Sequence, residues 1–77
     1  MFQPSNCNLK TLRKILEHQG CKHVRDNSGH EIWTRKDLLR PITFQSYIDP
    51  VPTFIMQQIM RHLKLSRKDV EEILKEI

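Results

Sequence analysis

Residues 26–33 read Asp26-Asn27-Ser28-Gly29-His30-Glu31-Ile32-Trp33, and this stretch decides the fold because it predicts a tight turn between two β-strands. Asp at the first turn position and Gly at the fourth favour a type I turn followed by a left-handed residue. Strands are therefore expected over residues 21–26 and 30–35. A histidine held at the turn exit is a candidate acid or base, since imidazole titrates near neutral pH. The plain alternative is a solvated surface histidine.

The length of this turn determines which side chains neighbour His30. A three-residue loop pairs Asp26 with His30 and sets Val24 opposite Ile32. The other face of the hairpin then carries Arg25, Glu31 and Trp33. A two-residue loop at Asn27-Ser28 instead sets Arg25 opposite His30 and Val24 opposite Glu31. The pairing of Val24 with Ile32 favours the first register, in which the Asp26 carboxylate lies beside His30 and orients its ring.

A helix is predicted immediately before the hairpin. Its apolar residues recur every three or four positions and share one face: Leu9, Leu12, Ile15 and Leu16. Asn8 is expected to cap the first turn, and Gly20 to end the helix in a left-handed conformation. Residues 1–7 are expected to form a flexible lead-in, so that a single domain spans residues 8–77.

The second half of the chain predicts one more strand and two more helices. β-formers favour a strand over residues 40–47, and a proline-containing break introduces a helix near residue 53. The wide apolar face of that helix suits packing on a sheet: Phe54, Ile55, Met56, Ile59, Met60 and Leu63. Ser66 and Asp69 predict a capping box for a final helix. The fold class is therefore α+β, with a three-stranded antiparallel sheet and helices on one of its faces.

Composition limits the classes of function. Seventy-seven residues make one small domain without room for a large cofactor pocket. No apolar run approaches the ~20 residues of a membrane span, and the N-terminus does not resemble a signal peptide. Two cysteines form no disulfide framework, and no Cys/His spacing matches a zinc site. We therefore expect a cytoplasmic protein without a cofactor, a metal or a membrane partner.

The net charge of +4 is unevenly distributed along the chain. Residues 1–47 contain eight Lys or Arg against four acids, whereas residues 48–77 contain five of each. A basic region around the hairpin favours a polyanion such as nucleic acid, or an acidic protein. The candidates for contacting nucleic-acid phosphates or bases are Lys22, Arg25, Trp33, Arg35 and Lys36. An ordinary solvated basic surface is the alternative.

One known family shares several of these positions: Gly20, Arg25, Gly29-His30 with Ile32-Trp33, and the closing Ile59, Leu63, Leu65 and Ser66. Over roughly residues 8–75 the chain resembles the HicA family of toxin–antitoxin modules. The resemblance implies a fold similar to a double-stranded-RNA-binding domain. It also implies a small endoribonuclease that cleaves mRNA and is neutralised by a HicB-type antitoxin.

The resemblance also implies roles for residues of the turn. His30 matches the catalytic histidine of the family's Gly-(Ser/Thr)-His motif, and Ser28, Gly29 and Asp26 would support the loop that holds it. Here Ser28 and Gly29 stand in swapped order, and Tyr47 occupies a position where the family often has a second histidine. As general base or acid, His30 would contribute about 10²–10⁴-fold to the rate of RNA cleavage.

Two other functions fit the same fold. One is a double-stranded-RNA-binding module without catalysis, and the other is an interaction domain whose basic face meets an acidic protein. Only His30 in its motif favours cleavage over these alternatives.

Overall fold

The computed structural model describes residues 2–77. Its elements in chain order are η1 (Pro4–Asn6), α1 (Leu9–His18), β1 (Lys22–Asn27), β2 (His30–Thr34), β3 (Ile42–Gln45), α2 (Thr53–His62) and α3 (Arg67–Glu76). The strands form one antiparallel sheet in the order β1-β2-β3. The predicted element order and fold class are confirmed.

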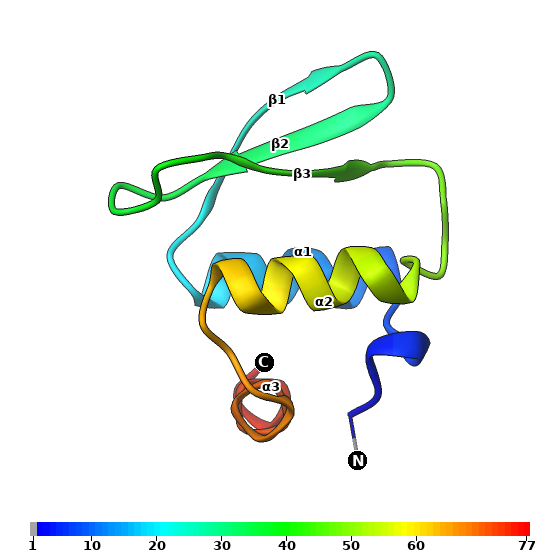
Figure 1. The fold of residues 1–77 in the computed structure, drawn as a ribbon, viewed down its shortest axis with the longest axis vertical. Helices are drawn as coiled ribbons and strands as arrows, with labels where there is room; N and C mark the ends of the chain where they lie inside the picture. Colours follow the sequence, from blue (N-terminus) through cyan, green and yellow to red (C-terminus); the bar gives the residue numbers. More distant parts are fainter. Residues whose placement is uncertain (1) are drawn as a thin grey trace.

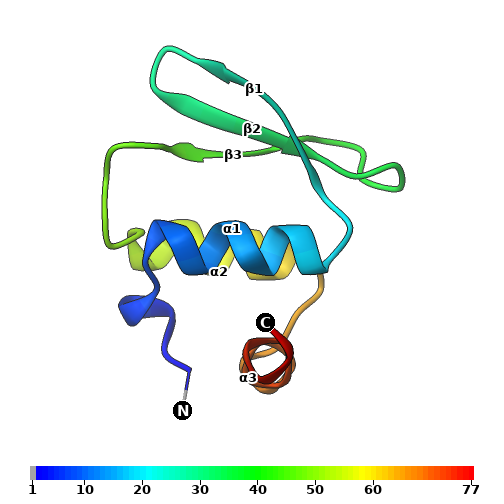
Figure 2. The ribbon, with the colours of Figure 1, turned by 180° about the vertical axis from the view of Figure 1, so that it is seen from behind.

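The elements form three layers (Figure 1). The sheet lies above α1 and α2, and α3 and η1 lie on the far side of these two helices. Figure 2 shows the same arrangement from behind, and no described element covers the upper face of the sheet. One face of the sheet therefore packs on helices, and the other is open.

The helix ends carry the capping residues that the sequence predicts. The side chain of Asn8 accepts a hydrogen bond from the Thr11 amide at 2.8 Å, which caps α1. Gly20, with φ +80°, follows the helix in the left-handed conformation. Ser66 and Asp69 form the predicted capping box at the start of α3.

The hairpin has neither of the registers expected from the sequence. Asn27 lies opposite His30, and Asp26 lies opposite Glu31. The loop therefore contains only Ser28 and Gly29, with φ of +53° and +82°. Two residues with positive φ make a type I′ loop, whose twist matches that of the strands it joins. The predicted type I turn is wrong because Ser28 adopts a left-handed conformation, which a serine side chain does not predict.

A β-bulge at Val24 provides the second correction. His23 lies opposite Trp33 and Arg25 opposite Ile32, so Val24 is the extra residue on β1. The expected pairing of Val24 with Ile32 is absent, and Val24 is 55% exposed. The two-residue loop, and not the bulge, sets Arg25 on the open face, away from Glu31 and Trp33.

The covered face of the sheet carries Glu31, Trp33, Ile42 and Phe44, all buried. The three apolar residues of this set belong to a core to which α1, α2 and α3 contribute, including Leu12, Leu16, Met56 and Val70. Phe54, expected on the buried face of α2, is instead 62% exposed.

The segment before α1 is packed, unlike the loose lead-in expected over residues 1–7. Phe2, Pro4 and Cys7 are buried, and the Val51 amide donates a hydrogen bond to the Cys7 carbonyl at 2.9 Å. Burial of these side chains beneath the helices explains the difference. Residue 1 lies outside the described part of the chain.

Candidate active site

His30 stands in a row of polar side chains on the open face of the sheet. Asn27 lies opposite it on β1 and Gln45 opposite it on β3, so the three side chains share one face. Directly paired residues have Cβ atoms about 5 Å apart. His30 is exposed and has one amide side chain on each side of it. The row therefore presents an imidazole between two neutral hydrogen-bonding groups.

The turn before His30 is held by the segment that follows β3. The Ser46 amide and the Ser46 hydroxyl both donate to the Gly29 carbonyl, at 2.8 and 2.9 Å. The Tyr47 ring lies against Gly29, because a Cβ there would be 3.0 Å from Tyr47 Cε1. The Gln45 side-chain amide donates to the Tyr47 hydroxyl at 3.2 Å. The phenol thus lies beside the turn, in the neighbourhood of His30.

Two of the predicted RNA-binding cations share the open face with His30. The two-residue loop sets Arg25 opposite Ile32, and the bulge beyond it sets Lys22 opposite Thr34, in the two rows that follow the His30 row. Both cations are exposed. Arg25, in the nearer of these rows, is the cation best placed to contact a phosphate held at His30.

Arg35 and Lys36 lie beyond the opposite end of β2. Five residues of extended chain separate His30 from Arg35, a distance of about 17 Å. The Arg35 guanidinium donates to Asp37 at 2.6 Å and to the Gln19 carbonyl at 2.9 Å. Arg35 and Lys36 are therefore too far from His30 to contact a phosphate held there.

Asp26 and Trp33 are not beside His30. Both lie on the covered side of the sheet, where Asp26 accepts a hydrogen bond from His23 at 2.8 Å. Trp33 is 4% exposed and stacks against His23 with 5.2 Å between ring centres. Because the hairpin register differs from both expected ones, Asp26 cannot orient His30, and burial removes Trp33 from contact with a base.

An ion pair between a half-exposed arginine and a buried glutamate keeps His30 on the open side. Arg13 of α1 binds both carboxylate oxygens of Glu31, with Nε 3.1 and 3.0 Å from them, and Trp33 Nε1 donates to the same carboxylate at 3.1 Å. The Arg13 hydrogen bonds hold the pKa of Glu31 below its usual value against the opposing effect of burial. Since successive strand residues alternate faces, fixing Glu31 inward fixes its neighbour His30 outward.

The covered edge of β1 has its own hollow, of about 430 Å³, which Arg13, His23, Asp26, Glu31 and Trp33 help to line. Four of its ionisable groups are paired with one another: His23 with Asp26, and Arg13 with Glu31. These contacts attach β1 and β2 to α1. We interpret the cluster as structural.

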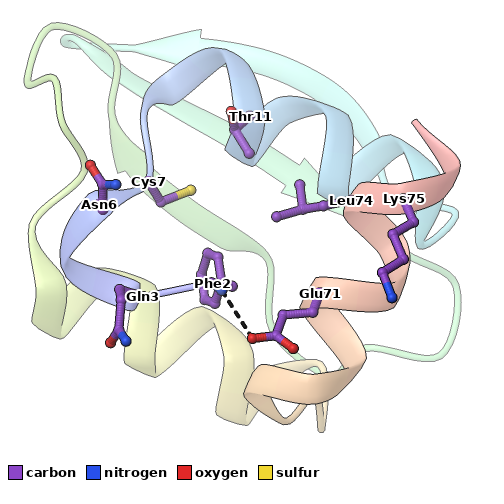
Figure 3. Close-up of a pocket in the computed structure, with 8 residues that line it drawn as sticks. All are labelled: Phe2, Gln3, Asn6, Cys7, Thr11, Glu71, Leu74 and Lys75. Atoms are coloured by element: carbon purple, nitrogen blue, oxygen red, sulfur yellow. Dashed lines mark hydrogen bonds between the residues drawn. The ribbon is translucent and has the colours of Figure 1, made fainter.

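A further hollow of about 430 Å³ lies between the N-terminal segment, α1 and α3 (Figure 3). The Phe2 amide donates to Glu71 at 3.0 Å across it. Burial, with a smaller effect of Asp49, raises the pKa of the Cys7 thiol at its wall to about 11. A thiol that stays protonated at neutral pH is a poor nucleophile, so Cys7 is not a candidate catalytic residue.

Three residues around His30 were not predicted from the sequence. Asn27 and Gln45 flank it only in the observed register. Phe54 lines a hollow of about 320 Å³ together with His30 and Gln45. The spacing of Met56, Ile59 and Met60 was a usable signal, because Phe54 lies off the helix face that those three residues define.

Comparison with protein-family models, with curated proteins and with solved structures finds no match to this chain. Each helix within residues 2–77 is too short and too polar to cross a membrane.

Proposed function

We propose that this chain is a small HicA-like endoribonuclease that cleaves mRNA with His30 as general acid or base. The observation that carries the proposal is the position of His30: exposed on the open face of the sheet, between Asn27 and Gln45, with Arg25 in the next row. The similarity to a double-stranded-RNA-binding domain and the HicB-type antitoxin partner are part of the same proposal.

RNA carries its own nucleophile, so the residues around His30 can promote cleavage without a metal or a cofactor. His30 takes the proton of a 2′-hydroxyl, and the 2′-oxygen attacks the adjacent phosphorus. The bond from phosphorus to the 5′-oxygen breaks, and that oxygen takes a proton from a protonated imidazole or from the Tyr47 phenol. The products are a 2′,3′-cyclic phosphate and a 5′-hydroxyl.

Charge develops on the phosphate oxygens during this step. Arg25 supplies a cation near the row, and the amides of Asn27 and Gln45 supply hydrogen-bond donors. Lys22 lies further along the same face and suits a phosphate of a neighbouring nucleotide. An acidic antitoxin surface that covers these cations would block RNA from the same face.

The experiment expresses wild type, His30→Gln and His23→Gln in a bacterial host and follows growth and mRNA integrity. The two histidines lie on adjacent strands but on opposite sides of the sheet. We expect wild type and His23→Gln to arrest growth and fragment mRNA. His30→Gln should do neither while it accumulates to the same level.

Other outcomes separate the alternatives. If wild type leaves mRNA intact but the purified protein binds RNA, the chain is a non-catalytic RNA-binding module. If the protein neither cleaves nor binds RNA, the remaining interpretation is an interaction domain that binds an acidic protein. If His30→Gln cleaves like wild type, His30 is not the acid or base.

A further inference from the structure

Phe54 is an exposed aromatic ring beside the candidate catalytic histidine. The hollow of about 320 Å³ that contains His30 lies between β3 and the beginning of α2. Phe54 lines it from α2, and Gln45 lines it from β3. The ring is 62% exposed although α2 buries Met56, Ile59 and Met60. The helix thus packs on one face and presents the phenyl ring to the hollow.

The environment of this ring matches what a nucleobase requires. An aromatic side chain offers a face on which any base can stack. The amide groups of Gln45 and Gln58 line the same hollow and offer donors and acceptors to a base edge. Gln45 donates through its NH₂ group to Tyr47, which leaves its carbonyl oxygen as an acceptor. Other exposed apolar residues, such as Leu39, do not line this hollow.

We propose that Phe54 stacks one unpaired base of a single-stranded RNA substrate, in the nucleotide next to the phosphate cleaved at His30. This inference rests on the proposed ribonuclease function. It assigns to Phe54 the role that the sequence suggested for Trp33, whose ring is buried on the other side of the sheet. A flipped-out base in this hollow would place its backbone phosphate on the open face, near Arg25.

The test uses a short, fluorescently labelled 2′-O-methyl RNA, which lacks the nucleophilic hydroxyl and therefore binds without being cut. Fluorescence anisotropy gives its Kd for wild type, Phe54→Leu and Phe54→Trp. The matched control is Leu39→Ala, which removes an exposed apolar side chain outside the hollow. Stacking of one base corresponds to a change of about 5- to 150-fold in Kd.

We expect Phe54→Leu to weaken binding by at least about fivefold, Phe54→Trp to keep it, and Leu39→Ala to leave it unchanged. Thermal unfolding of each variant checks that the fold is retained. If Phe54→Leu binds the RNA as wild type does, the inference is overturned while the proposed function stands. If wild type does not bind the RNA and does not cleave its unmodified counterpart, both fail.

Discussion

Arg13 of α1 binds both carboxylate oxygens of Glu31 of β2, and this pair attaches the sheet to the helices beneath it. The Glu31 side chain is 5% exposed, whereas that of Arg13 is 41% exposed. Only the carboxylate is therefore fully withdrawn from water, and its remaining hydrogen bond comes from Trp33. The orientation of His30, one residue earlier, depends on this anchor.

Glu31→Gln should destabilise the protein by about 1–3 kcal/mol, because the neutral amide cannot replace the charge-assisted bonds from Arg13. Urea unfolding measures the loss. Glu17→Gln is the control, since Glu17 is exposed on α1 and is not hydrogen-bonded to Arg13. Equal stability of the two variants would contradict the anchoring role of Glu31.

The same pair predicts how stability depends on pH. The Arg13 hydrogen bonds lower the pKa of Glu31 in the folded protein, whereas an unfolded glutamate titrates near about 4.3. The contribution of the Arg13–Glu31 pair to the free energy of unfolding is therefore complete above about pH 5. It is lost as the pH falls through the lowered pKa of Glu31 in the folded protein. The difference in unfolding free energy between wild type and Glu31→Gln should shrink on acidification. A difference that stays constant from about pH 7 to 3 would contradict this assignment.

Two glycines with nearly equal backbone angles give a matched pair of variants. Gly20 and Gly29 have φ of +80° and +82°, so Gly→Ala should cost about 1–2 kcal/mol at either position. A Cβ at Gly29 meets the Tyr47 ring at 3.0 Å, whereas at Gly20 the nearest atom is Arg35 Cδ at 3.8 Å. We expect Gly29→Ala alone to shift the NMR signals of Tyr47 and His30. Identical shifts in both variants would argue against the contact between ring and turn.

Local signals explain the parts of the fold that the sequence predicts. The caps at Asn8 and Ser66 join groups only three residues apart, so their residue types are enough to place the helix ends. The apolar spacing of α1 likewise depends on nothing beyond the helix itself. The order of helices and strands followed from such short-range patterns.

The errors arose where distant residues decide the outcome. Glu31 is charged and Ile32 is apolar, so polarity alone would place Ile32, and not Glu31, on the buried face of the strand. Its partner Arg13 lies 18 positions earlier on another element, so no local pattern predicts the buried carboxylate. The two-residue loop then sets Asp26, and not Arg25, opposite Glu31, and the bulge at Val24 changes the register only beyond Arg25. For this reason the neighbours of His30 differ from those expected, while its role as acid or base stays a prediction.

Both thiols should be unreactive in the folded protein. Cys7 and Cys21 are 1% and 5% exposed, and burial raises the pKa of each, that of Cys7 to about 11. Ellman's reagent should titrate neither thiol at neutral pH until denaturant is added. Rapid reaction of Cys7 in native buffer would show that the N-terminal segment does not cover it.

Single-turnover cleavage of one RNA by purified wild type, His30→Gln and His23→Gln tests the central claim most directly. We predict that His30→Gln lowers the rate by about 10²–10⁴-fold and that His23→Gln lowers it far less. We also predict wild-type products that end in a 2′,3′-cyclic phosphate and a 5′-hydroxyl. A rate for His30→Gln equal to that of wild type would contradict the account.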